Sequence, residues 1–264
     1  MIRTIREIWL KRAILRHFVA LLLTSSYRTK ALGFAWALLD PLLFMGVYYL
    51  VFGKIIANRP PEFMLHIYVG VIAFRFLNSS MSQGAGVLRS QGGLIREIPF
   101  PKAVLPVAVV LARLFDFGAG WLVAIPLAVI FGYPPSPWWL LLPALVLMQA
   151  LLVAGFTLAT TYVGLFFADI QNILNVGLRL WFYLSPVLYP LALVQRKTAN
   201  RPDLWALYLS NPMTSVIQCY HTVVLDRALP STAYVVYGAV SGAVVLLLGL
   251  WIFARGEGEI AKYI

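Results

Sequence analysis

The chain has 264 residues, of which 61% are hydrophobic and only 12% are charged, and its formal net charge is +11. Because soluble domains carry roughly a quarter charged residues, this composition excludes an ordinary soluble protein and indicates one embedded in a membrane. The positive charge requires no nucleic acid partner, since an excess of Lys and Arg beside a membrane surface explains it.

Residues 1–33 are predicted to form a basic helix that lies at the membrane surface. Glu7 is the only acidic residue among them, and the apolar residues fall on one helical stripe. A secretory signal peptide is the alternative, but Arg16 and His17 interrupt its apolar core and no small-residue cleavage site follows. The stripe comprises Ile8, Leu15, Val19 and Leu22.

Six membrane-spanning helices are predicted within one membrane domain over residues 34–256. Each apolar run has about 20 residues or more, and in lipid a helix satisfies all of its own backbone hydrogen bonds. Residues 195–231 hold two apolar stretches too short to span, for which we expect re-entrant or interfacial helices, and residues 257–264 are a tail. The fold class is therefore an all-α integral membrane protein. The predicted spans are 34–57, 64–86, 104–131, 138–166, 172–194 and 232–254.

The distribution of Lys and Arg predicts that both termini lie in the cytoplasm. With the N-terminus inside, the inner segments hold twelve basic residues and the outer loops hold six. Cytoplasmic segments of membrane proteins carry such an excess.

The sequence has no constellation typical of an enzyme. The histidines His17, His66 and His221 lie far apart and lack the spacing of metal ligands. Gly53-Lys54 lacks the glycine-rich loop of a nucleotide-binding motif. We therefore expect no catalytic residue, metal or cofactor in this chain, and any nucleotide to be bound by another subunit.

Charged residues inside the predicted spans are candidates for a polar conduit, because such charges cost about 2.5 to 3.5 kcal/mol on insertion scales. Asp40 forms a satisfied turn at a helix break or faces a conduit. Arg113 and Asp116 are spaced to pair on one helix face, as a structural pair or as part of a conduit. Arg75 and Arg179 have no acidic residue nearby in the sequence, so each lines a conduit or extends to the interface.

Aromatic residues make up 14% of the chain, and many lie in or near the predicted spans. Belts of aromatic residues at the bilayer interface explain most of them in any membrane protein. A path for glycans would also use them, because aromatic faces stack on the C–H edges of sugar rings. Together with Arg75, the candidates for a conduit or gate are Tyr48, Phe74, Trp181, Tyr183 and Tyr189.

Residues 94–101 form a charged, proline-ended island between the second and third predicted spans. Pro99 and Pro101 end any helix that begins here, so only one or two helical turns fit. The island is suited to docking its apolar residues into a soluble partner while its charges set the register; an ordinary loop is the alternative. The docking candidates are Leu94, Ile95, Arg96, Glu97, Ile98, Phe100 and Pro101.

Four motifs follow one another in an order and at a spacing that cover nearly the whole chain. They are Tyr27 to Gly33 with Trp36 and Pro41-Leu42, Gly92 to Pro106, Ser185-Pro186-Val187 with Tyr189, and Asn211-Pro212-Met213. Together they resemble the type-2 permeases of ABC exporters, and within them the branch that exports O-antigens, teichoic acids and other envelope glycans. Members often have Arg-Asp after the fourth span, where this chain has Ala168-Asp169.

The resemblance implies a half-transporter in the bacterial inner membrane. Two copies of this chain are expected to line a path for a lipid-linked polysaccharide. Two copies of a separate cytoplasmic subunit are expected to bind below and to hold the ATP and Mg²⁺. The resemblance also makes residues 94–101 the coupling helix and residues 195–231 an outer gate.

Arg28 and Lys30 are candidates for contact with the lipid pyrophosphate at the inner face, although the positive charge of cytoplasmic segments also explains them. Two other functions stay open. One is export of a small lipid or drug by the same family, and the other is a membrane-embedded glycan enzyme or carrier that works without ATP.

Overall fold

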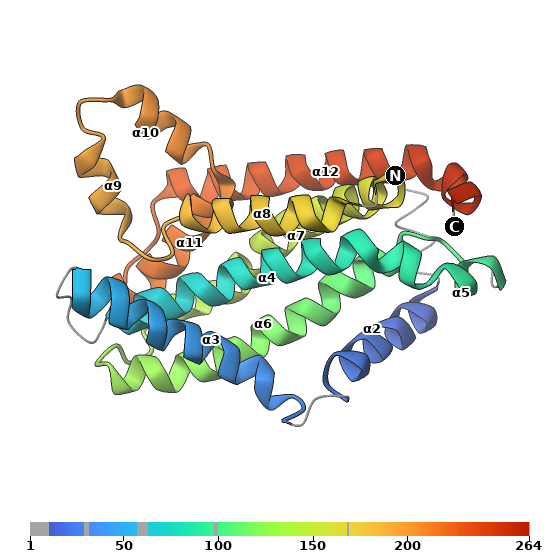
Figure 1. The fold of residues 1–264 in the computed structure, drawn as a ribbon. Helices are drawn as coiled ribbons and strands as arrows, with labels where there is room; N and C mark the ends of the chain where they lie inside the picture. Colours follow the sequence, from blue (N-terminus) through green and yellow to red (C-terminus); the bar gives the residue numbers. More distant parts are fainter. Residues whose placement is uncertain (1–10, 29–31, 57–62, 98–99, 168, 264) are drawn as a thin grey trace.

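The computed structural model describes residues 11–28, 32–56, 63–97, 100–167 and 169–263. Within these ranges the chain is a bundle of helices without a strand (Figure 1), which confirms the predicted all-α class. The long helices are α3 (Ala35–Tyr48), α4 (Phe63–Ser90), α6 (Val104–Ile130), α7 (Leu142–Phe166) and α12 (Thr232–Tyr263). The shorter elements are α2 (Arg12–Tyr27), η1 (Tyr49–Ile56), α5 (Gly92–Glu97), η2 (Pro137–Leu141), α8 (Ile170–Tyr183), α9 (Leu191–Lys197), α10 (Pro202–Leu209), α11 (Pro212–His221) and η3 (Thr222–Asp226).

Five helical segments in the described part are long and apolar enough to cross a membrane, and each matches a predicted span. The π-helix η1 continues α3, and the 3-10 helix η2 leads into α7. The five segments are Ala35–Phe52, Phe63–Ser90, Val104–Ile130, Pro137–Phe166 and Thr232–Gly256.

The remaining predicted span, 172–194, differs from the structure. Helix α8 ends at Tyr183 after 14 residues, about 21 Å at 1.5 Å per residue. Pro186 and Pro190 explain the break, because proline donates no backbone hydrogen bond and disfavours helix at the residue before it. The chain turns at Ser185 and begins the separate helix α9 at Leu191.

Helix α4 lies at the centre of the bundle, where it packs against α3, α6, α7, α8 and α11. The short helix α11 is almost wholly buried between α4, α7 and α12. Asn211 caps it by accepting a hydrogen bond from the backbone N–H of Met213, and Pro212 occupies the first turn, where its missing N–H costs nothing. Short helices are thus present within residues 195–231, and their re-entrant or interfacial position stays a prediction.

Glycines bring α7 close to its neighbours. A Cβ atom placed on Gly164 would overlap the carbonyl oxygen of Ala85 in α4, and one on Gly155 would overlap the backbone of Val245 in α12. Between helices in lipid, such small residues let backbones approach and van der Waals contacts form.

Gln149 on α7 connects three helices through buried hydrogen bonds. Its Nε2 atom donates to the carbonyl oxygen of Ala73 on α4 at 2.7 Å, and its Oε1 atom accepts from the Tyr220 hydroxyl of α11 at 2.9 Å. The bridge fixes α11 against the core of the bundle.

Replacing Gln149 by leucine should therefore destabilise the protein by about 1 to 3 kcal/mol, because the buried Tyr220 hydroxyl loses its acceptor. The midpoint of thermal unfolding in detergent measures this loss. The double variant Gln149→Leu, Tyr220→Phe removes both partners and should lie closer to the wild type. A single variant as stable as the wild type would show that the bridge contributes nothing.

The predicted basic helix is present as α2, which packs against α6. Phe18 and Leu22 are buried there and Leu15 and Val19 are partly covered, whereas Arg16 is exposed. Ile8 lies outside the described residues, and a position of α2 at the membrane surface stays a prediction.

The start of α2, the helix α5 and the last turns of α12 lie at one end of the bundle, and α9 and α10 project from the other end (Figure 1). That both ends of the chain lie on one side of the membrane, and that this side is cytoplasmic, remain predictions from the basic residues.

Candidate transport groove

Helix α4 carries a polar stripe along its C-terminal half. Every residue from Arg75 to Ser90 that is not buried is polar or glycine, and these residues recur every three or four positions. Polar residues in a membrane-spanning helix usually face the bundle interior or a water-filled cavity. The stripe comprises Arg75, Asn78, Ser79, Ser82, Gln83, Gly86, Arg89 and Ser90.

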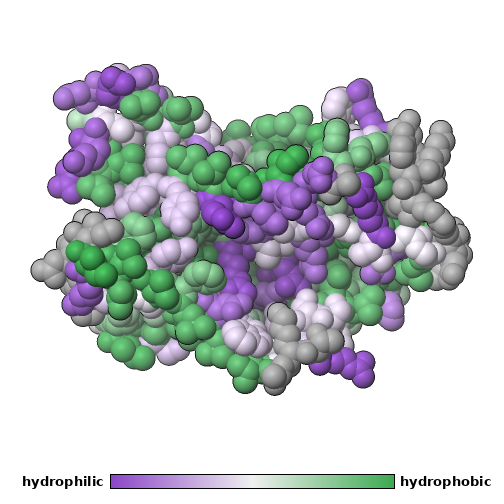
Figure 2. Space-filling view, viewed as in Figure 1, coloured by the Kyte–Doolittle hydropathy of each residue, from purple (hydrophilic) through white to green (hydrophobic). Residues whose placement is uncertain are grey.

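The first residues of this stripe, Arg75, Asn78 and Ser79, form the floor of a groove between α3 and α8. The groove has a volume of about 550 Å³. Figure 2 shows hydrophilic side chains gathered in a hollow at the middle of this face, with hydrophobic side chains around it. The lining residues are Asp40, Phe44, Tyr48, Val71, Phe74, Arg75, Asn78, Ser79, Asn175, Arg179, Phe182 and Tyr183.

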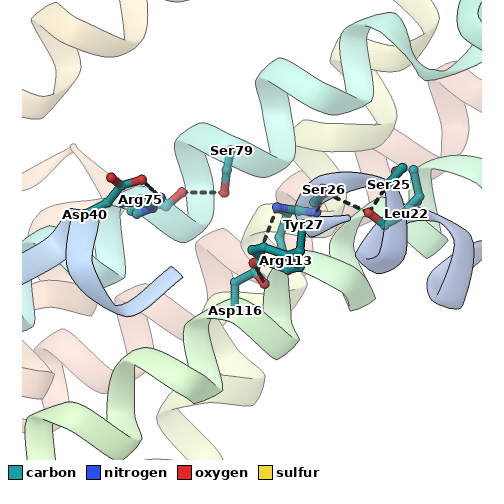
Figure 3. A network of polar contacts seen from close by, with 9 residues as sticks. All are labelled: Leu22, Ser25, Ser26, Tyr27, Asp40, Arg75, Ser79, Arg113 and Asp116. Carbon is teal, nitrogen blue, oxygen red and sulfur yellow. Dashed lines mark hydrogen bonds and ion pairs between the residues drawn. The ribbon is translucent and has the colours of Figure 1, made fainter. Parts of the chain in front are cut away.

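An ion pair between Asp40 of α3 and Arg75 of α4 lies at the edge of the groove (Figure 3). The guanidinium donates to the carboxylate at 2.8 Å, and the carbonyl oxygen of Arg75 accepts a hydrogen bond from the Ser79 hydroxyl at 2.7 Å. The contact gives each charge a partner and places both beside the groove, and a conduit role for either residue stays a prediction. Asp40 and Arg75 are 35 positions apart in the sequence, so their spacing could not reveal the contact.

The predicted pair of Arg113 and Asp116 on α6 is confirmed, at 2.6 Å. Arg113 also donates to the Ser26 hydroxyl at 2.8 Å, and the Tyr27 hydroxyl donates to Asp116 (Figure 3). These contacts tie the end of α2 to α6. These residues border a smaller cavity of about 290 Å³. This cavity and the groove share the lining residues Asp40, Arg75 and Ser79.

Helix α8 forms the opposite wall of the groove and presents polar residues on one face. Gln171, Asn175 and Arg179 follow one another at intervals of four and are exposed. Gln171 lies over Gly86 of α4, where an added Cβ atom would be 2.7 Å from its Nε2 atom. Arg179 forms no hydrogen bond or ion pair with any residue that the structure describes. The polar stripes on α4 and α8 were not predicted, although their spacing of three or four residues is visible in the sequence.

Four of the six predicted conduit residues line the groove: Tyr48, Phe74, Arg75 and Tyr183. The ring of Phe182 connects two of them, with its centroid 5.7 Å from that of Tyr48 and 5.3 Å from that of Phe74. Aromatic side chains therefore gather where the groove approaches the end of the bundle that carries α9 and α10.

The two remaining candidates, Trp181 and Tyr189, lie beside the groove and connect motifs that are far apart in the sequence. Trp181 donates its Nε1 hydrogen to Asn211 at 2.8 Å, and the Asn211 amide donates to the Ser185 hydroxyl at 3.0 Å. The Tyr189 hydroxyl donates to the carbonyl oxygen of Tyr183 at 2.7 Å. The Ser-Pro-Val and Asn-Pro-Met motifs thus meet in one hydrogen-bonded junction.

A tyrosine pair anchors the protruding α9–α10 segment. The Tyr208 hydroxyl donates to the Tyr189 hydroxyl at 3.4 Å. Burial raises the pKa of Tyr208, and the hydrogen bond to Tyr189 raises this pKa further; burial also raises the pKa of Tyr189. Both hydroxyls therefore keep their protons.

The predicted docking island begins with the short helix α5. Leu94 and Ile95 are partly covered by the chain's own apolar cluster around α2 and α6, and Phe100 is buried against Phe18 at a ring distance of 5.5 Å. Phe100 therefore anchors the segment to the bundle. Ile98 lies outside the described residues, as do the side chains of Arg96 and Glu97, and Pro101 is partly exposed.

The predicted contacts at the inner face are described only in part. Arg28 is exposed at the end of α2, where it lines a shallow pocket with Tyr27, Phe34 and Phe115. Lys30 lies outside the described residues.

Two histidines that are far apart in the sequence meet in the structure. The rings of His66 and His221 stack with centroids 3.8 Å apart, and the His221 ring lies 3.0 Å from the carbonyl oxygen of His66. Among the residues that the structure describes, no three His, Cys, Asp or Glu side chains gather as metal ligands.

Comparison with known proteins gives consistent matches over most or all of the chain. The family model described as ABC-2 type transporter matches residues 16–225. The chain is similar to the O-antigen export system permease protein RfbA of Myxococcus xanthus, with 34% identity over 100% of both chains. It is also similar to the protein of the same name from Klebsiella pneumoniae, at 25% identity over 89% of each chain, and to the polysialic acid transport protein KpsM of Escherichia coli, at 22% over 86% of each.

Proposed function

Because the chain belongs to the ABC-2 type transporter family, we propose that it is the permease subunit of a polysaccharide exporter in the bacterial inner membrane. A separate subunit hydrolyses the ATP that drives transport. The names of the relatives, which export O-antigen or transport polysialic acid, support this substrate class.

The polar stripe on α4 is the observation that carries the proposal. A polysaccharide needs hydrogen-bonding groups along its path, and the stripe supplies them over 16 residues, about 24 Å of helix. Phe182 and its aromatic neighbours supply surfaces for stacking on sugar rings. A small apolar lipid or drug would instead favour an apolar groove, so the lining favours a glycan over that alternative.

A second copy of the chain would close the groove. The helices α3 and α8 line the groove, and both carry exposed apolar residues, as does η1, which continues α3. These residues suit contact with a matching copy, which would convert two grooves into one enclosed path. They are Leu43, Phe44, Val47, Leu50, Ile173, Val176 and Leu180.

Helix α5 is the proposed contact with the ATP-binding subunit. It lies at the end of the bundle opposite α9 and α10 (Figure 1), and its Leu94 and Ile95 pack against the apolar cluster that contains Phe18 of α2. In this mechanism, closure of the ATPase dimer moves α5 and shifts the two permease copies between arrangements with different access. The exposed Arg28, with Lys30, is proposed to receive the lipid pyrophosphate before export.

Replacing Asn78 and Ser82 together by leucine tests the proposed path. We expect export to fall to about a tenth or less, because each lost hydrogen-bonding group contributes about 1 kcal/mol. Polysaccharide at the cell surface is measured in a strain that lacks its own permease, with the amount of permease in the membrane determined in parallel. The matched control Asn78→Gln, Ser82→Thr keeps the polarity and should retain export. Normal export by the leucine variant would refute the groove as the path.

A further inference from the structure

The groove contains more positive than negative charge. Arg75 and Arg179 both line it, and Asp40 is the only carboxylate among its lining residues. Since Asp40 pairs with Arg75 at 2.8 Å, Arg179 is left without a counterion among the residues that the structure describes. Its side chain is exposed to the groove from α8.

The five spanning segments that the structure describes hold no unpaired carboxylate. Within the five spanning segments, Asp40 and Asp116 are the only acidic residues. Asp40 pairs with Arg75, and Asp116 pairs with Arg113. The same segments of a second copy would therefore bring only carboxylates that are already paired.

The acidic residue nearest to Arg179 along α8 does not fill this role. Asp169 precedes the helix by one residue and lies ten positions from Arg179, about 15 Å along the axis. Two copies of a membrane protein share one orientation, so Asp169 of a second copy lies at the same depth as that of the first. A bound anion would supply the missing counterion.

The surroundings of Arg179 suit an anionic ligand. The guanidinium presents a planar fork of donors that matches phosphate and carboxylate groups. Asn175 lies one turn before it on α8, and Asn78 lies across the groove on α4; both are exposed and line the same volume. Their amides can donate to the remaining oxygens of such a group.

We propose that Arg179, with Asn175 and Asn78, binds a phosphate or carboxylate group of the transported molecule. The inference rests on the proposed function, and it extends that function by assigning an anionic substrate group to one position in the groove. The group belongs to the pyrophosphate of the lipid carrier or to acidic sugars of the glycan.

Binding to the intact transporter, permease with its ATP-binding subunit in lipid nanodiscs, tests the proposal. The probes are inorganic pyrophosphate, a hexasaccharide that alternates glucuronic acid with N-acetylglucosamine, and neutral maltohexaose. We expect at least one anionic probe to bind more tightly than maltohexaose. Arg179→Gln should weaken anion binding about tenfold or more and leave maltohexaose binding unchanged. Arg179→Lys keeps the charge but loses the planar fork. Its affinity for the anionic probes should therefore lie between that of the wild type and that of Arg179→Gln.

The outcomes separate the two sources of the anion. Binding of pyrophosphate alone assigns the site to the lipid carrier, and binding of the acidic hexasaccharide alone assigns it to the glycan. The proposal is overturned if Arg179→Gln binds both anions like the wild type, or if the wild type prefers neither over maltohexaose. The export assay with Asn78→Leu, Ser82→Leu separates this failure from failure of the proposed function. If that variant stops export while Arg179→Gln binds anions normally, only the anion site is wrong; if that variant exports normally, the groove is not the path.

Discussion

Replacing Gly164 by leucine should leave little folded permease in the membrane. The added side chain would begin inside the carbonyl group of Ala85, whose backbone cannot move aside without separating α4 from α7. Overpacking in a core usually costs 1 to 3 kcal/mol, and we expect about 3 kcal/mol or more here, because backbone is the obstacle. The amount of monodisperse protein extracted in detergent and its thermal midpoint measure the effect.

Gly118 offers a matched control on α6. It is exposed, and a Cβ atom placed on it would have no neighbour within 4 Å. The same substitution there, Gly118→Leu, should leave the midpoint near that of the wild type or raise it slightly, since glycine is a poor helix former. Equal midpoints for the Gly164 and Gly118 variants would mean that the close approach of α4 and α7 is not needed.

Exchanging the charges on α5, with Arg96→Glu and Glu97→Arg together, should abolish coupling to the ATP-binding subunit. The exchange keeps the net charge of α5. It brings each new charge against a partner residue of the same sign, and contacts between like charges oppose binding. We expect the ATP-binding subunit to co-purify with the wild type and largely to be lost from the variant. ATPase activity of the complex in lipid gives the second measurement.

A charge exchange at the other end of the bundle serves as the control. Arg201 and Asp203 form an exposed ion pair at 4.0 Å beside α10, so Arg201→Glu with Asp203→Arg should leave the ATPase complex intact. If the α5 variant retains full coupling, α5 is not the contact. If no ATP-binding subunit co-purifies with the wild type, the exporter proposal itself fails and a gradient-driven carrier becomes the better hypothesis.

Local patterns in the sequence predicted most of the helices. Five of the six predicted spans are present as long helices, and the pair of Arg113 and Asp116 follows from their spacing on one helix. The remaining span was predicted too long, because apolar composition continues from α8 through Ser185 although the prolines interrupt the helix. A hydropathy average over a window of residues does not detect a helix break caused by a proline, which lacks the backbone N–H donor.

The candidate groove could be predicted only in part. The aromatic candidates were chosen as single residues, and four of the six conduit candidates prove to share one volume. The polar stripes on α4 and α8 were visible as a spacing of three or four residues, but the sequence did not show that they face each other. That arrangement depends on which sides of α4 are covered by α6 and α7.

The sequence by itself determined that this protein is a membrane-embedded helical bundle of a recognisable transporter type, because composition, helix length and the order of motifs are properties of the chain alone. Only the tertiary structure decided that Asp40 neutralises Arg75, that Asn211 joins Trp181 to Ser185, and that Arg179 stays without a counterion among the described residues. Ion pairs and hydrogen bonds require their atoms to lie within a few ångströms. Between residues 26 to 35 positions apart, such distances are set by how closely the helices pack.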